Sequence, residues 1–189
     1  KTDFIRGYGI QGKGERENWQ TVSTVGFGAA LKEQLATPGK WKISLGGRGE
    51  TLPNYENKIS LDTENTDQWG LPLVKVDFKY GDNELAMMEH MTKASEEMLT
   101  KAGFKDVESY RTYPSPGSAV HEMGTARMGH DPRTSVLNKH NQMHDVKNVF
   151  ITDGSCMTSS GCQNPSLTYM ALTARACNYA INQFNSNHL

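Results

Sequence analysis

Alternating apolar and polar residues in the middle of the chain predict short strands. In residues 72–80 every second side chain is apolar or aromatic, and these side chains share one face: Val74, Val76, Phe78 and Tyr80. This alternation predicts a half-buried strand. Shorter patterns predict further strands over residues 3–8, 41–45, 58–61, 104–110 and 146–152. The pair Gly46-Gly47 is predicted to end the second of these strands in a turn.

A spacing of three or four residues between apolar side chains predicts a long helix over residues 83–102. Asp82 is a suitable N-cap, and Gly103 is the glycine expected at the C-terminal end. The predicted apolar stripe consists of Leu85, Met88, Met91, Ala94, Met98, Leu99 and Ala102. A shorter helix is predicted over residues 26–36, where Pro38-Gly39 follows and stops it.

A second long helix is predicted from Asn164-Pro165 to about Phe184. Asn is a preferred N-cap and Pro is favoured at the first helical position. The helix is apolar nearly all round, which predicts that it is buried. Together these elements indicate an α+β fold, with a mostly antiparallel sheet and two long helices.

The N-terminal segment from Gly7 to Gly12 matches the letters G-x-G-x-x-G. A dinucleotide-binding fingerprint also needs a strand before these glycines and a helix after them. Gly12-Lys13-Gly14 is a poor helix start and no apolar helical pattern follows. We therefore expect a loop or a bulged strand here and no N-terminal dinucleotide-binding fold within the chain.

Composition excludes several classes of function. The 189 residues carry 20 Lys and Arg against 21 Asp and Glu, a formal net charge of −1, which argues against a nucleic-acid partner. No apolar run reaches the length of a membrane-spanning helix, so no membrane segment is predicted. Three cysteines are an odd number and do not form a fully paired disulfide framework.

Two features carry candidate chemistry. His121 lies in a glycine-punctuated segment, and a histidine can act as a general base because its pKa lies near neutrality. The helix start at Asn164-Pro165 presents unpaired N–H groups and a partial positive charge, which suit an anionic or electron-rich ligand. The plainer interpretation is an ordinary loop histidine and a pair of residues that only begin a helix.

A zinc site is the other chemical alternative. His130, His140 and His144 are close in sequence, and His140 and His144 have the i, i+4 spacing of two ligands on one helical turn. Turn residues surround them and no cysteine or carboxylate completes the set, so no metal site is predicted. Cys156 and Cys162 are too far apart for a C-x-x-C redox motif.

Three segments in order resemble one known family. They are residues 121–129 (HEMGTARMG), 148–155 (NVFITDGS) and 164–168 (NPSLT). This combination resembles the C-terminal part of the glucose–methanol–choline (GMC) family of FAD-dependent oxidoreductases. Weaker similarity extends to residues 53–62 and 69–72, so that the resemblance covers nearly the whole chain.

The resemblance implies roles for individual residues. His121 falls on the family's catalytic histidine and Asn164 on its second active-site position. The residues implied to contact the flavin are Asp153, Gly154, Asn164, Pro165, Ser166 and Thr168. The implied reaction removes a proton and a hydride from the CH–OH group of an alcohol or sugar, with His121 as base and FAD as hydride acceptor at N5. Asp145 departs from the pattern, because the family often has Gly near this position.

Domain organisation follows from the same resemblance. Residues 1–115 are expected to form a substrate-binding-type region, and residues 116–189 a C-terminal segment that carries the active-site and flavin-contacting motifs. The chain begins at Lys1 without Met, so we expect it to be a fragment whose partner is the N-terminal FAD-binding domain of the same polypeptide. The isolated fragment is expected to be empty and inactive, with a bare face that self-association can cover. Its cellular location is not predicted.

Two alternatives remain at this stage. One is a non-catalytic binding or interaction domain of the same fold, in which His121 and Asn164 have no chemical role. The other is a zinc hydrolase that uses His130, His140 and His144.

Overall fold

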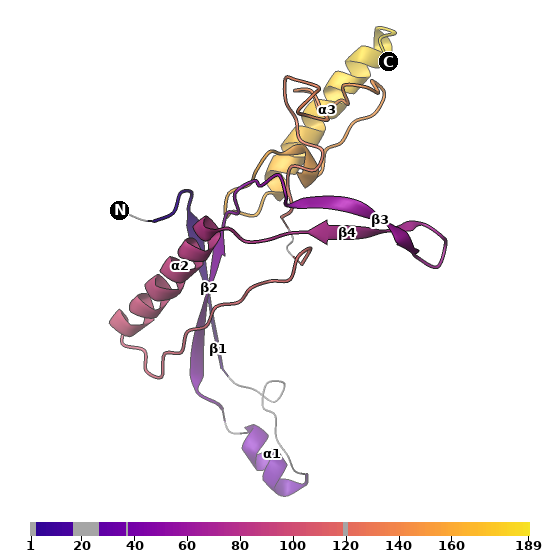
Figure 1. Ribbon diagram of the computed structural model, residues 1–189. Coiled ribbons are helices and arrows are strands. Elements are labelled where there is room, and N and C mark those ends of the chain that lie inside the picture. Colours follow the sequence, from indigo (N-terminus) through magenta and orange to yellow (C-terminus); the bar gives the residue numbers. More distant parts are fainter. Residues whose placement is uncertain (1–2, 17–26, 37, 119–120) are drawn as a thin grey trace.

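A computed structural model describes residues 3–16, 27–36, 38–118 and 121–189. Their regular elements, in chain order, are β1 (Tyr8–Arg16), α1 (Ala29–Ala36), β2 (Trp41–Gly49), β3 (Lys58–Thr66), β4 (Pro72–Asp77), α2 (Asp82–Lys101), the 3-10 turn η1 (Gly154–Cys156) and α3 (Ser166–Asn185). The α+β class with two long helices is confirmed. The strands form two separate antiparallel pairs, β1–β2 and β3–β4. Figure 1 shows these two ribbons leaving in different directions from a junction near the start of α3.

The two strands of the β1–β2 ribbon are longer than the sequence predicts. Its register runs without interruption from Tyr8 opposite Gly49 to Arg16 opposite Trp41. The predicted strand over residues 3–8 is therefore wrong in position, and the predicted turn at Gly46-Gly47 is wrong because β2 continues through both glycines. Glycine is weak in a strand by itself, so these positions need another reason.

That reason is helix α2, which packs on the ribbon. A Cβ atom built on Gly49 would lie 2.6 Å from the sulfur of Met87, and one on Gly47 would lie 2.4 Å from the sulfur of Met91. The absence of side chains at Gly47 and Gly49 thus lets two methionines of α2 approach the backbone of β2. Met87 is only 2% exposed, whereas the predicted stripe residue Met98 is 45% exposed.

Helix α2 begins one residue earlier than predicted. Gly81, rather than Asp82, occupies the N-cap position, and Asp82 lies within the first turn. The buried carboxylate of Glu84, in the same turn, accepts hydrogen bonds from the backbone N–H of Gly81 (2.9 Å) and of Leu52 (3.0 Å). Gly103 follows the helix with φ +85°, the left-handed conformation expected after a helix end.

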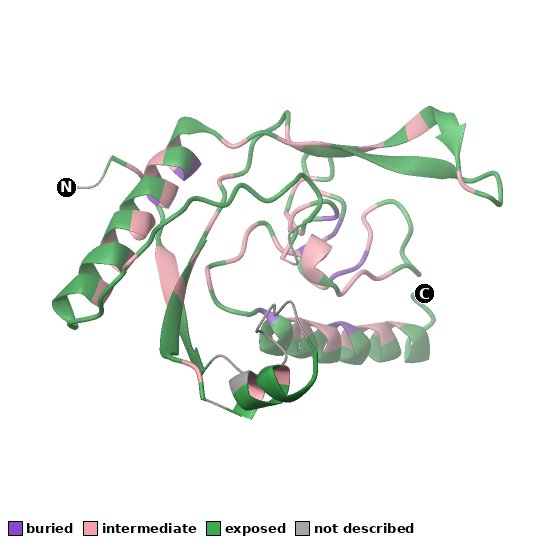
Figure 2. Ribbon diagram, turned by 90° about the horizontal axis from the view of Figure 1, so that it is seen from below, coloured by how far each residue is buried: buried purple, intermediate pink, exposed green. Residues whose placement is uncertain are grey.

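The β3–β4 ribbon is largely exposed. Leu61 and Val74, which face each other in its register, are 63% and 65% exposed. Figure 2 shows this ribbon almost entirely in the colour of exposed residues. The predicted strand over residues 104–110 is absent from the structure, where these residues form bends and irregular backbone.

Residues 121–165 fold without extended strands. Isolated bridges pair Met128 with Leu137, Leu137 with Met143, and Gln142 with Phe150. The predicted strand over residues 146–152 is therefore wrong, since only Phe150 of this range takes part in a bridge. The side chains of Leu137, Asn141 and Cys156 are fully buried in this segment.

Helix α3 lies beside this irregular segment (Figure 1). Its N-cap is Pro165, so Asn164 precedes the cap and the predicted capping by Asn164 is wrong. The prediction that the helix is buried is also wrong, because Leu167 and Met170 are 78% and 68% exposed. None of the described helices is long and apolar enough to cross a membrane. The predicted start of α1 at Gly26 lies outside the described residues.

Candidate active site

The histidine segment runs beside the turn that contains η1. The backbone N–H of Ala126 donates to the carbonyl of Ser155 (3.1 Å), and that of Met128 donates to the carbonyl of Cys156 (2.9 Å). Ala126 and Cys156 are buried at this contact. Two of the three family-like segments are thus joined directly, through backbone hydrogen bonds.

Helix α3 closes this arrangement through Tyr169. The phenol oxygen lies 3.7 Å from the sulfur of Met123, and a Cβ atom built on Gly154 would lie 2.7 Å from the same oxygen. That Cβ would also lie 3.2 Å from the carbonyl oxygen of Glu122. The early part of α3, the turn at Gly154 and the residues that follow His121 therefore meet at one point.

The predicted catalytic residues flank this junction in sequence. His121 is half-buried and directly precedes Glu122, whose carbonyl faces Gly154. Asn164 is exposed and directly precedes the N-cap of α3. The two segments approach the same end of α3. The convergence of the imidazole and the amide side chain on one cavity stays a prediction.

The predicted flavin-contacting residues lie at the turn and at the helix start. Asp153 is exposed and its carboxylate accepts hydrogen bonds from the backbone N–H and the hydroxyl of Ser155, which shapes η1. Ser166 and Thr168 are exposed in the first turn of α3, and Pro165 is buried. No side chain caps this helix and its first turn contains no acidic residue, so no carboxylate of that turn offsets its partial positive charge.

A buried amide missed by the sequence analysis holds the segment to α3. Asn141 has φ +63° and is 0% exposed. Its side chain donates to the carbonyl of Ile151 (3.0 Å) and accepts from the guanidinium of Arg175 (3.0 Å). Burial raises the pKa of the neighbouring Cys156 thiol. Arg175 is the lone charged residue of α3. A single charge in an apolar helix usually has a polar partner, so the sequence could have indicated that Arg175 binds a group such as Asn141.

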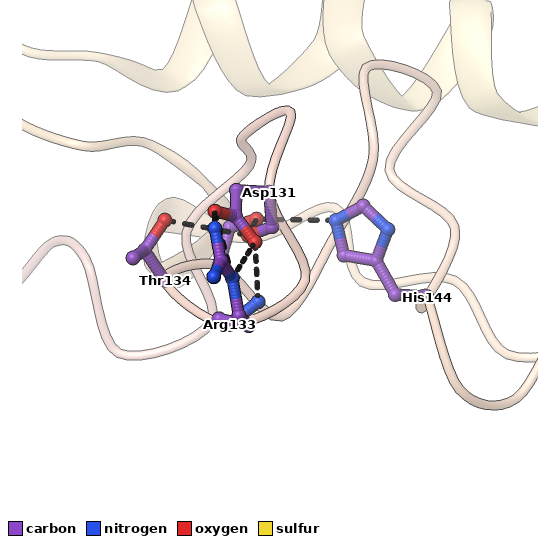
Figure 3. Close-up of polar contacts among 5 residues, drawn as sticks. Asp131, Arg133, Thr134 and His144 are labelled. Carbon is purple, nitrogen blue, oxygen red and sulfur yellow. Dashed lines mark hydrogen bonds and ion pairs between the residues drawn. The ribbon is translucent and has the colours of Figure 1, made fainter.

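Two of the three histidines of the zinc alternative, His140 and His144, make other contacts. The ring of His140 stacks on Tyr179 at a centroid distance of 3.8 Å, and burial together with the charges of Lys139 and Arg175 lowers its pKa. Figure 3 shows His144 pointing at the loop of Asp131, where its ring contacts the hydroxyl of Ser135 at 3.1 Å. Within the described ranges no group of three or more His, Cys, Asp or Glu side chains is arranged to hold a metal ion.

Two hollows of the surface lie away from the junction. An open hollow of about 390 Å³ lies along the last turns of α2, beside Lys93 and Lys101. Another of about 220 Å³ lies between residues 52–57 and 79–84. Neither includes His121 or Asn164.

An α+β chain in which a histidine segment, a tight turn and the start of a final helix meet in this order has the arrangement expected of the C-terminal part of a GMC enzyme. The sequence profile described as GMC oxidoreductase matches residues 53–173. The chain therefore belongs to the GMC oxidoreductase family.

Similar proteins agree with this assignment. A 2-methyl-1,2-propanediol dehydrogenase from Mycolicibacterium austroafricanum is 36% identical over 138 residues, which are 72% of this chain and 25% of the relative. A 6'''-hydroxyparomomycin C oxidase from Streptomyces lividus is 37% identical over 123 residues, 65% of this chain and 22% of the relative. The fructose dehydrogenase large subunit of Gluconobacter japonicus is 27% identical over 176 residues, 93% of this chain and 32% of the relative. The chain thus spans between 22% and 32% of the length of these relatives.

Proposed function

We propose that this chain is part of an FAD-dependent oxidoreductase that oxidises the CH–OH group of an alcohol or sugar. The observation that supports it most is the meeting of the three family-like segments at the start of α3, described above. The relatives support the substrate class, since their names specify a diol dehydrogenase and a fructose dehydrogenase. Residues 1–115 serve the substrate side, and residues 116–189 form one wall of the flavin site.

The residues at this wall fit a flavin ring. The first turn of α3 offers backbone N–H groups that no side chain caps, and its positive end suits an electron-rich ring edge. The side chains of Ser166 and Thr168 are exposed there, and Asn164 precedes them. Asp153 shapes the adjacent turn through Ser155, so its contribution is the position of the Gly154 backbone. When bound, FAD supplies the hydride acceptor at N5.

His121 and Asn164 carry out the proton chemistry. A nitrogen of the His121 imidazole accepts the hydroxyl proton of the substrate as its CH–OH group becomes a carbonyl. The amide N–H of Asn164 donates a hydrogen bond to the same substrate oxygen and fixes its orientation. The alkoxide character that develops on that oxygen is stabilised by both groups.

The exposed face of α3 is the proposed contact with the N-terminal FAD-binding domain of the same polypeptide. Six apolar residues spaced alternately by three and four form this face. They are Leu167, Met170, Ala174, Cys177, Ile181 and Phe184. Four of them are among the exposed large hydrophobic residues of the chain, and Phe184 is 70% exposed. An apolar stripe of this spacing is typical of a buried helix face. Relatives about three times as long as this chain provide a domain that can cover it.

The catalytic proposal is tested with His121→Ala in the complete polypeptide encoded by the gene. Loss of a general base lowers the rate by about 100-fold or more, so kcat for an alcohol or sugar is expected to fall by that factor with unchanged flavin content. His130→Ala is the matched control, because His130 is exposed and directly follows the same segment. Turnover unchanged by His121→Ala would favour a non-catalytic domain of the same fold.

The partner proposal is tested by thiol labelling. Cys177 lies in the exposed face and Cys156 is buried. In the chain of residues 1–189, Cys177 is expected to react quickly with a maleimide and Cys156 slowly, and the dialysed chain is expected to be colourless. In the complete polypeptide Cys177 becomes protected and the protein is yellow. Fast labelling of Cys177 in a yellow, active protein would contradict docking at this face.

A further inference from the structure

Tyr169 touches every segment of the candidate site and has no role in the proposed chemistry. Its hydroxyl lies 3.7 Å from the sulfur of Met123, two residues after His121. Its backbone N–H donates to the carbonyl of Pro165 (3.1 Å), the N-cap of α3. Burial, together with Cys156, Asp153 and Glu122, raises the pKa of the phenol, which therefore stays protonated at neutral pH.

Gly154 shows how tightly this phenol is held. A Cβ on Gly154 would lie 2.7 Å from the phenol oxygen and 3.1 Å from the ring carbon that carries it. Gly154 is not among the glycines with positive φ, and it lies in a 3-10 turn that other residues can adopt. Glycine is therefore needed at this position for space, and the space is filled by Tyr169.

The same contact reaches the segment of His121. The hypothetical Cβ of Gly154 would also lie 3.2 Å from the carbonyl oxygen of Glu122, a backbone atom next to His121. A displacement of Tyr169 is thus passed on to Glu122 through the turn, and to Met123 through the sulfur contact. A catalytic imidazole displaced by about 1 Å can lose about 100-fold in rate.

We propose that Tyr169 is a positioning residue, which fixes His121 and the Asp153-Gly154 turn at a set distance from the start of α3. This inference rests on the proposed function. Tyr169 supports the geometry of the site through Glu122, Met123 and Gly154, and takes no part in bond making.

The test uses the complete flavin-loaded polypeptide and four variants. Tyr169→Phe removes only the hydroxyl and Gly154→Ala inserts a methyl group against it. The double variant, Gly154→Ala with Tyr169→Phe, frees the closest contact of that methyl group. Tyr179→Phe is the matched control, because it makes the same chemical change on α3 at a ring that stacks on His140. The measurements are kcat, KM, flavin content and the pH profile of kcat/KM.

We expect Tyr169→Phe to lower kcat about 10-fold, with KM changed less than 2-fold and flavin content unchanged. The acid limb of the kcat/KM profile is expected to shift, because it reports the base His121. Gly154→Ala is expected to lower kcat further, and the double variant to recover part of that loss. Tyr179→Phe is expected to match the wild type.

Two results overturn the inference separately from the proposed function. A wild type that oxidises an alcohol, with Tyr169→Phe equal to it in kcat and in pH profile, removes the positioning role alone. Equal losses in the single Gly154→Ala variant and in the double variant also remove it, since the methyl group then does not act through Tyr169. A wild type without flavin or without activity on any alcohol or sugar overturns the proposed function instead.

Discussion

Extended strands and buried side chains are found in different halves of the described chain. Residues 3–118 contain all four described strands and α2, yet only Glu84 and Met87 are buried there. Residues 121–189 contain no extended strand among the described elements, but most of the buried side chains. These are Ala126, Leu137, Asn141, Gln142, Cys156, Pro165 and Ala176. Figure 2 shows the same division in its burial colours.

The difference shows that order does not require strands. In the C-terminal half, side-chain amides replace the ladder of a sheet. Gln142 donates to the carbonyl of Lys147 (2.7 Å) and accepts from the amide of Asn138 (2.9 Å), while Asn141 bonds to Ile151 and Arg175. In the N-terminal half, the β1–β2 register is uninterrupted and the β3–β4 register shifts between Leu61 and Thr66, but most ribbon faces are open to solvent. Buried amides can therefore hold the candidate site in residues 121–189 in place, although the neighbouring β1–β2 and β3–β4 ribbons are mostly exposed to solvent.

The largest effect is expected at Asn141, on which the order of the C-terminal half depends. Asn141→Ala leaves the carbonyl of Ile151 and the guanidinium of Arg175 without this partner, and it places alanine at φ +63°. The two lost hydrogen bonds cost about 0.5–1.5 kcal/mol each. The left-handed backbone costs about 1–2 kcal/mol, so we expect a loss of about 2–5 kcal/mol in the free energy of unfolding. Urea denaturation measures it.

Two variants separate the causes. Asn141→Gly keeps the backbone conformation and loses both side-chain bonds, whereas Asn141→Asp keeps an acceptor for Arg175 and loses the donor to Ile151. In the Asn141→Ala variant, hydrogen exchange is expected to show a larger fall in protection, relative to the wild type, in residues 121–185 than in residues 8–49. A fall in protection confined to the β1–β2 ribbon would contradict the claim that the order of the C-terminal half depends on Asn141.

The next effect is expected at Met87, the most buried hydrophobic residue of the N-terminal half. Met87→Ala removes the side chain that lies on Gly49 and leaves a cavity between α2 and β2. Such truncations cost about 2–5 kcal/mol in closed cores. The ribbon's other face is open, so we expect about 2 kcal/mol by urea denaturation. Met98→Ala, on a side chain that is 45% exposed, is the matched control with an expected change below about 1 kcal/mol. Equal losses for the two variants would mean that α2 is not anchored through Met87.

Sequence patterns could predict the periodic elements of the fold. The alternation in residues 72–80 and the helical spacing in residues 83–102 gave β4 and α2, each correct within a few residues. The glycines of β1 and β2 carry no hydrophobic signal, and the neighbours of Gly47 and Gly49 on β2 are Met91 and Met87, which are distant in sequence. No local pattern contains that contact.

For the candidate site, sequence order located the segments but not the contacts between them. The motif at Asn164-Pro165 located the start of α3 within two residues. The apolar composition of α3 was misread as burial, because no described side chain covers Leu167 and Phe184, which are 78% and 70% exposed. In the sequence, Tyr169 looks like any other residue of the apolar helix α3, and only the structure shows its contact with Gly154.

The smallest effect is expected at Glu84, and it separates the halves by pH. Burial raises the pKa of this carboxyl group, but the hydrogen bonds donated by Leu52, Gly81 and Asn83 outweigh burial and hold the pKa below its ordinary value of 4.5. The unfolded chain therefore binds the proton first as pH falls. The stabilisation is fully present above about pH 4.5 and is lost as pH falls through the lower pKa of the folded state.

Glu84→Gln tests this at both ends of the pH range. At pH 7 the variant exchanges charged hydrogen bonds for neutral ones, which we expect to cost about 1 kcal/mol in the free energy of unfolding. Below the folded-state pKa the wild type carries a neutral carboxyl group, so the gap between variant and wild type is expected to close. Glu96→Gln, on an exposed part of the same helix, is the control that should leave the pH dependence unchanged. A gap that stays constant from pH 7 to pH 3 would mean that Glu84 supports the N-terminal half by its shape, and that the charge of its carboxylate contributes nothing there.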